Sequence, residues 1–372
     1  MKKLLSVFAV AIFLTATMLV SCKKTDNSSP HANLTVAQNK TNLEQTSSDL
    51  STQMTTLQSA PGMTAATSIM NIGFPFSLKS GVVQTMNSVN ALVKSKMDGT
   101  NLLTTKSVNL QVDAQFVFSE WIGIYTWSPT QNEWLKTSNS ANTIIFKYPS
   151  TPTGSTNDAT LTLYSYTEQL FGTSTYQPTS ISLDIYIASV KQMSLNLTAT
   201  YATNGQPTYL NIAYFVNPFI FSEVYTNSSV TVGSVTTSTV SETLSLLNST
   251  TTILAVSTTV TGNLTDINNP TTNTVSGYIQ MEDIKLSMNV DAKDLNAITN
   301  PTDAQYNQYI VMNIGYASDG VKIADFVYYT DPSTGGNFML KFPDGTTSTA
   351  QVYFATAMTN LQTAFGKLGI NL

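Results

Sequence analysis

The chain has 372 residues, of which 42% are hydrophobic and 10% are charged, and its formal net charge is −5. The length and the hydrophobic content are typical of a globular protein with one large or two medium domains, but the charged content is low against the roughly 25% of typical domains. All 17 basic residues are lysines, which argues against nucleic-acid binding and against arginine clamps for phosphate. His31 is the only histidine and Cys22 the only cysteine, so neither a Ser-His-Asp site nor a zinc site of His and Cys ligands is expected.

The first 22 residues contain the most specific motif in the chain. Two lysines precede an uncharged stretch over residues 4–20. The end of this stretch overlaps the motif Leu19-Val20-Ser21-Cys22. The stretch is short for a membrane span and ends in small residues, as a signal peptide does. The four-residue motif resembles the lipobox of bacterial lipoproteins. The resemblance implies that residues 1–21 are a signal peptide, that cleavage precedes Cys22, and that its sulfur carries a diacylglycerol anchor. The alternatives are an ordinary secretory peptide and an uncleaved signal anchor.

A polar tether and a helical neck are predicted next. Residues 22–33 are polar and are expected to be flexible, and Lys23-Lys24-Thr25-Asp26 resembles the export signals of surface lipoproteins from Bacteroidota. Residues 34–99 form the neck. A heptad pattern predicts its first helix over 34–60, which Pro61-Gly62 ends, and a second helix is predicted over 82–97. The heptad residues are Val36, Leu43, Leu50 and Leu57.

The body, residues 100–372, alternates apolar and polar residues with a period of two and then ends in a helix. Turn signals such as Asn204-Gly205 and Asp319-Gly320 separate these segments and are typical of β-hairpins. A final helix is predicted over 350–368. The closing order of strand, Asp344-Gly345 turn and helix resembles the ends of uncharacterised lipoproteins from Bacteroidota, and this resemblance implies no particular activity.

We therefore predict an α+β fold built on a large, curved antiparallel β-sheet with a meander or half-barrel-like path over residues 100–345. The N-terminal helices and the C-terminal helix are expected to pack on its apolar face. This arrangement resembles, in architecture only, the half-barrels of periplasmic lipid-carrier lipoproteins.

Chemistry-bearing residues are few, and no catalytic, metal or cofactor site is predicted. A glycosidase needs two carboxylates at a set distance. The candidates lie near strand ends without a spacing that pairs them: Glu120, Glu133, Glu168 and Glu223. The densest oxygen clusters are Glu282-Asp283, Asp291 with Asp294, and residues 266–269, and none matches an EF-hand loop. We interpret these clusters as solvated loops.

One aromatic group is the candidate ligand site. Trp121, Tyr125 and Trp127 are expected on one face of a strand. A turn over 128–133 would place Trp127 opposite Trp134 and Tyr125 near Lys136. The aromatic faces could bind a sugar or an apolar ligand. They could instead be core residues. The apolar residues on the opposite face of the strand favour this second interpretation.

Two functions remain open for a lipid-anchored, non-enzymatic protein of the outer membrane, on its periplasmic face or on the cell surface. The first is binding of an apolar or amphipathic ligand between sheet and helices. The alternative is a structural or adhesive surface lipoprotein whose uncharged Ser, Thr and Asn faces contact glycans or other proteins. The predicted partners are the membrane, through lipidated Cys22, and a lipid-like or glycan ligand. The sequence does not indicate the oligomeric state.

Overall fold

The computed structural model describes residues 30–73, 115–172, 175–233, 235–263, 271–331, 335–349 and 352–353. Cys22, the predicted helix over 82–97 and nearly all of the predicted C-terminal helix lie outside these residues. The statements below refer to the described part of the chain.

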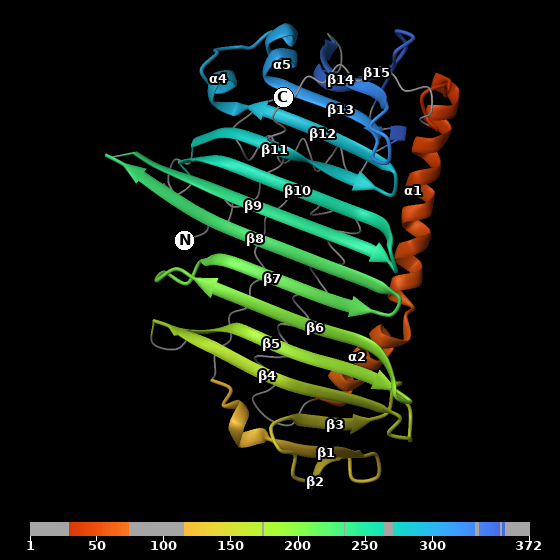
Figure 1. Ribbon diagram of the computed structural model, residues 1–372, viewed down its shortest axis with the longest axis vertical. Helices are drawn as coiled ribbons and strands as arrows, with labels where there is room; N and C mark the ends of the chain where they lie inside the picture. Colours follow the sequence, from red (N-terminus) through yellow and green to blue (C-terminus); the bar gives the residue numbers. More distant parts are fainter. Residues whose placement is uncertain are drawn as a thin grey trace.

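The β-rich character predicted from the sequence is confirmed, because sixteen strands of the described chain form a single sheet (Figure 1). From β3 to β16 the strands lie side by side in chain order, and β1 and β2 extend the sheet beyond β3. The strands are β1 (Gly123–Ser128), β2 (Glu133–Ser138), β3 (Ile144–Tyr148), β4 (Ala159–Phe171), β5 (Thr175–Ile187), β6 (Val190–Tyr201), β7 (Pro207–Val216), β8 (Phe219–Val232), β9 (Val235–Asn248), β10 (Thr251–Asn263), β11 (Thr271–Met281), β12 (Ile284–Asp291), β13 (Ile310–Tyr316), β14 (Lys322–Asp331), β15 (Gly335–Lys341) and β16 (Thr347–Thr349).

The sheet is mixed, which corrects the prediction of a purely antiparallel one. Strands β1 and β3 pair in parallel, and the other neighbouring strands pair antiparallel. The exception arises because β2 returns along one side of β1 and occupies the end of the sheet. The chain then crosses to the other side of β1, where β3 runs in the direction of β1.

The two faces of the sheet differ in chemistry. Along each long strand, buried apolar side chains alternate with partly exposed polar ones, as in β9, where Val240, Leu244 and Leu246 are buried and Ser241 and Ser245 are not. We call the face that carries the buried apolar side chains the core face, and we call the opposite face the outer face. Burial of apolar area on the core face stabilises the fold by roughly 25 cal/mol per Å².

Two α-helices of the described chain, α1 and α2, precede the sheet. Helix α1 (Val36–Gln58) lies inside the range predicted for the first helix, and its heptad residues Leu43 and Leu57 are buried. It runs along one set of strand ends, from β13 to the turn after β9 (Figure 1). Pro61 not only follows α1 but also starts α2 (Pro61–Ile72), an element that the sequence analysis missed, since proline suits a first helical position.

Helix α2 packs closely on β5 and β6. A Cβ atom added at Gly62 would come within 2.5 Å of the carbonyl oxygen of Gln192, and the hydroxyl of Tyr214 on β7 lies 3.5 Å from the sulfur of Met63. The short helices are η1 (Phe118–Trp121), α4 (Ala292–Asn296) and α5 (Asp303–Tyr309). No described helix is both long enough and apolar enough to cross a membrane.

Candidate functional site

The predicted aromatic site forms a hairpin with the register that the sequence indicates. Strands β1 and β2 pair Trp127 with Trp134 and Tyr125 with Lys136. Trp121 differs, because it ends the 3-10 helix η1 instead of extending β1, and its carbonyl oxygen accepts a hydrogen bond from the Tyr125 hydroxyl at 3.0 Å. The strand alternation therefore does not extend back to Trp121.

The rings of this hairpin pack against one another. Trp127 and Trp134 meet edge to face with centroids 5.4 Å apart, and Phe146 of β3 contacts both Trp134 and Tyr125. Trp134 also donates from Nε1 to the carbonyl oxygen of Gly73 at 2.7 Å. Tyr125 and Trp127 are only 5% and 9% exposed. This geometry favours a stabilising role, because the two rings present little surface to a ligand.

Lys136 is oriented toward the backbone as well as toward a ring. Its Nζ donates to the carbonyl oxygen of Ile122 at 2.9 Å and lies 5.8 Å from the centre of the Tyr125 ring. The ammonium thus donates a hydrogen bond to the backbone carbonyl oxygen of the residue just before β1. Its alkyl chain lies over Gly123, where an added Cβ would come within 2.5 Å of Lys136 Cε. The assignment of Lys136 to a ligand site stays a prediction.

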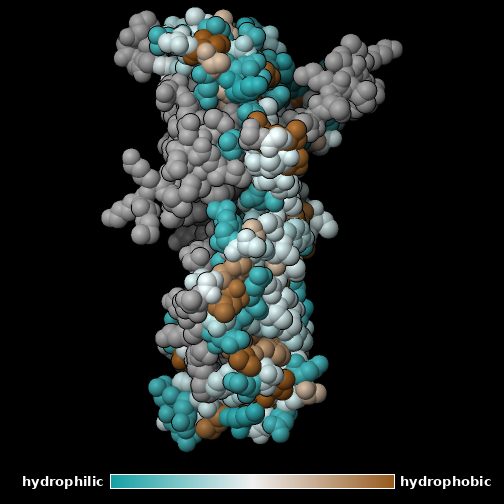
Figure 2. Space-filling model, turned by 90° about the vertical axis from the view of Figure 1, so that its left-hand side faces the viewer, coloured by the Kyte–Doolittle hydropathy of each residue, from teal (hydrophilic) through white to brown (hydrophobic). Residues whose placement is uncertain are grey.

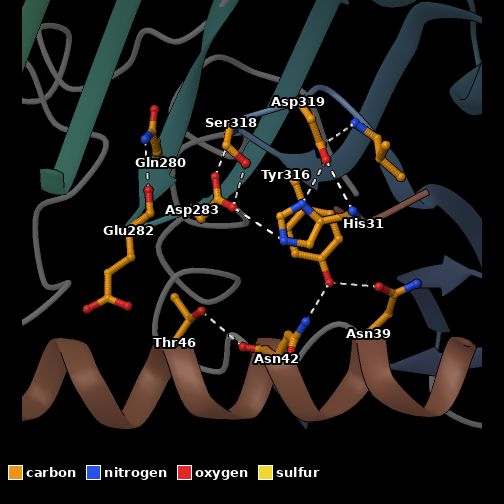
Figure 3. A network of polar contacts seen from close by, with 11 residues as sticks. His31, Asn39, Asn42, Thr46, Gln280, Glu282, Asp283, Tyr316, Ser318 and Asp319 are labelled. Carbon is orange, nitrogen blue, oxygen red and sulfur yellow. Dashed lines mark hydrogen bonds and ion pairs between the residues drawn. The ribbon is translucent and has the colours of Figure 1, made fainter. Parts of the chain in front are cut away.

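A second cluster joins the start of the chain to the sheet (Figure 3). The imidazole of His31 stacks on the ring of Tyr316 with centroids 3.7 Å apart and an interplanar angle of 6°. Its Nδ1 lies 2.8 Å from Asp319 Oδ2, and its Nε2 lies 3.7 Å from Asp283 Oδ2. His31 was expected in the flexible tether over residues 22–33, whereas the structure docks it between two carboxylates.

Helix α1 is attached to the same cluster. The hydroxyl of Tyr316 donates to Asn39 Oδ1 at 2.7 Å and accepts from Asn42 Nδ2 at 2.8 Å. Burial raises the pKa of this tyrosine, so it remains a hydroxyl at neutral pH. We call these residues the N-terminal docking site: His31, Asn39, Asn42, Asp283, Tyr316 and Asp319.

The two carboxylates of the N-terminal docking site are held by backbone turns. Asp283 accepts from the amide and the hydroxyl of Ser318 at 2.7 and 2.8 Å. Asp319 accepts from the amide of Val321 at 3.0 Å through its other oxygen. The Glu282-Asp283 pair is expected to be solvated, and the Asp283 side chain is indeed 41% exposed while it takes part in this cluster. The Asp319-Gly320 turn was the one signal in the sequence for the position of the cluster.

The glutamates considered for catalysis are not gathered in one place. Glu168 accepts hydrogen bonds from the Phe116 amide at 2.8 Å and the Tyr166 hydroxyl at 2.7 Å. Glu223 lies on the core face of β8 and is 3% exposed, as is Glu242 on β9, a residue that the sequence analysis did not single out. In the described chain no group of three or more His, Cys, Asp and Glu side chains is placed to hold a metal ion.

The outer face carries aligned rows of small uncharged side chains. One row crosses seven strands, from β4 to β10, and a second row lies beside it. The first row is Ser165, Ser182, Asn196, Ala213, Ser222, Ser245 and Ala255, and the second is Thr167, Ser180, Thr198, Asn211, Val224, Thr243 and Ser257. We call these two rows the polar rows.

Neighbouring side chains in the polar rows bond to one another in places. Ser222 and Ser245 hydroxyls lie 2.7 Å apart, and Ser182 donates to Asn196 at 2.8 Å. Seen from the side in Figure 2, hydrophilic and intermediate residues dominate the coloured surface, and hydrophobic residues form small separate groups. The two polar rows themselves contain no charged residue.

No family model, curated protein or solved structure matches this chain. Its function must therefore be inferred from the chemistry of its own surfaces and clusters.

Proposed function

We propose that the chain is a lipid-anchored, non-enzymatic protein of the outer membrane whose outer sheet face binds neutral glycans. The observation that carries the proposal is the pair of polar rows, in which Ser, Thr and Asn occupy most positions across seven strands and are interrupted only by Ala213, Val224 and Ala255. This is the adhesive alternative predicted from the sequence. It is supported by the register of strands β4 to β10, which aligns the polar rows on the outer face.

The chemistry of the polar rows matches that of an uncharged sugar chain. Hydroxyl and amide groups both donate and accept hydrogen bonds, as sugar hydroxyls do. Adjacent strands are about 4.8 Å apart, so the rows present a regular series of such groups to an extended ligand. The absence of arginine and the low charge of the chain disfavour an anionic ligand.

Anchoring at Cys22 would place the N-terminal docking site near the membrane. His31 is nine positions after Cys22, so the N-terminal docking site would lie within roughly 30 Å of the lipid. A fatty-acid probe supplied to cells should label the wild-type protein but not Cys22→Ala, and equal labelling of both would contradict the anchor. Protease treatment of intact cells would distinguish the cell surface from the periplasmic face.

The proposal includes the finer architecture predicted from the sequence. The predicted helices over 82–97 and 350–368 would join α2 on the core face, beside α1 along the strand ends, and leave the outer face open, giving a curved α+β half-barrel-like body. The positions of α2 on β5 and β6 and of α1 along the strand ends support this division between the two faces.

A second candidate function is binding of an apolar or amphipathic ligand. It is favoured by a hollow of about 500 Å³ at β13–β15, whose lining includes Met312, Phe326 and Phe342 beside Lys322 and Lys341. Native mass spectrometry of the detergent-extracted protein would test it, since a lipid that co-purifies at one copy per chain would favour this function.

The glycan proposal is tested by binding to immobilised neutral oligosaccharides. Thr198→Glu replaces a short side chain of the polar rows with a longer one and should reduce binding, because the added bulk would hold the sugar chain away from the neighbouring hydroxyl and amide groups. Thr137→Glu on the terminal strand β2 is the matched control and should bind like the wild type. Failure of the wild-type protein to bind any neutral oligosaccharide would overturn the proposed function.

A further inference from the structure

One cluster on the outer face differs from the uncharged residues around it. Asp184 of β5 is 8% exposed. Its Oδ2 accepts from the hydroxyls of Tyr164 and Tyr186, each at 3.3 Å, and Lys191 Nζ lies 2.7 Å from the same oxygen. Three donors thus converge on one oxygen of a carboxylate that lies beside the uncharged polar rows.

The other oxygen of Asp184 remains open. Within the described residues no hydrogen bond reaches Oδ1, and Oδ1 is not among the buried oxygen atoms that lack a partner. A partly buried carboxylate with one engaged and one open oxygen is a strong acceptor for a ligand hydroxyl, because charge-assisted hydrogen bonds are about twice as strong as neutral ones.

Tyr164 supplies an aromatic surface beside this oxygen. It occupies a bulge of β4, since the register with β5 shifts between Leu163 and Ser165, and it is 43% exposed. The extra residue leaves the ring of Tyr164 outside the regular row of small side chains. Exposed aromatic rings beside a few fixed polar groups are typical of sites that orient a small ligand.

The charge of the cluster favours a neutral ligand. Lys191 compensates Asp184, so neither a cation nor an anion meets an uncompensated charge. The hydrogen bond to Asp184 raises the pKa of Lys191, and burial together with the nearby Asp184 raises the pKa of Tyr164 to about 12. Both groups are therefore donors at neutral pH.

We propose that Tyr164, Asp184, Tyr186 and Lys191 form a subsite for one pyranose ring of a neutral glycan. The C–H face of the sugar lies on the Tyr164 ring, one sugar hydroxyl donates to Asp184 Oδ1, and another accepts from Lys191. Asn196 lies in the adjacent polar row, opposite Ser182, and contacts the next sugar. This inference rests on the proposed glycan-binding function and assigns its strongest contact.

The test uses the full-length lipoprotein in detergent and a panel of neutral hexasaccharides of glucose, mannose and xylose. Tyr164→Ala and Asp184→Asn should each weaken binding of the preferred hexasaccharide by roughly tenfold or more. Tyr164→Phe keeps the ring and should stay within about threefold of the wild type. Tyr329→Ala is the matched control, because Tyr329 is another exposed tyrosine, 52% accessible, on the distant strand β14.

The outcomes separate the subsite from the function on which it rests. Loss of binding in Tyr164→Ala and Asp184→Asn, with retention in Tyr164→Phe and Tyr329→Ala and unchanged circular dichroism, supports the subsite. Wild-type affinity in Tyr164→Ala and Asp184→Asn overturns the subsite while the glycan function stands. A wild-type protein that binds no hexasaccharide overturns both.

Discussion

Replacement of His31 by alanine is expected to release the start of the chain from the sheet without unfolding the body. The side chain contacts the body through its stack on Tyr316 and its bond to Asp319, and both partners come from β13 and the turn that follows it. Helix α1 keeps its own contacts to Tyr316 and to the turn after β9. The effect should therefore be local.

The size of the effect follows from these two contacts. A stacked aromatic pair contributes about 1 kcal/mol, and a hydrogen bond to a carboxylate contributes about 1.5 kcal/mol. The His31 side chain is 20% exposed and that of Asp319 is 12% exposed, so solvent screening is limited. A loss of about 2.5 kcal/mol would lower the ratio of docked to undocked chain roughly 60-fold.

Hydrogen exchange measures this directly. The amide of Leu34 donates to the carbonyl oxygen of His31 at 3.2 Å. In His31→Ala this segment should undock more often, so the protection of the Leu34 amide against exchange should fall. Asp319→Asn should produce part of the same loss, and the double mutant should be less than additive. Thr35→Ala, which removes a local helix cap, provides a control for simple fraying of α1. Protection in His31→Ala within twofold of the wild type, or an equal loss across β5 and β6, would refute the reasoning.

Three further changes test the fold. Trp127→Ala should cost about 3–5 kcal/mol in denaturant unfolding because its ring is buried, and a loss below about 1 kcal/mol would contradict a core role. Gly62→Ala should destabilise by about 1–3 kcal/mol, since the clash with the Gln192 carbonyl outweighs the roughly 1 kcal/mol gain in helix propensity. Two hydrogen bonds from Thr330 hold the pKa of Asp303 below its ordinary value of 3.8. The stability contributed by Asp303 is therefore present above that value and lost as the pH falls through the lower folded pKa. The difference in acid unfolding between wild type and Asp303→Asn should vanish at the lowest pH, and a constant difference would contradict this assignment.

Local patterns determined much of the fold. Alternation with a period of two indicated the strands, and a short turn between two such segments sets the register of a hairpin, which is why the pairing of Trp127 with Trp134 was predicted correctly. The heptad pattern of α1 and the turn at Asp319-Gly320 are equally local features. Each depends on residues close together in the chain, so a single sequence is enough to indicate it.

Only the tertiary structure decided which distant residues meet. His31 and Asp319 are 288 positions apart, and no pattern in either segment indicates their contact. The parallel pairing of β1 with β3 depends on a crossing, and the polar rows depend on the register of seven strands taken together. A strand shifted by one residue would exchange its two faces, so the accumulated register, which no local segment encodes, places the serines and threonines of β4 to β10 on one continuous surface.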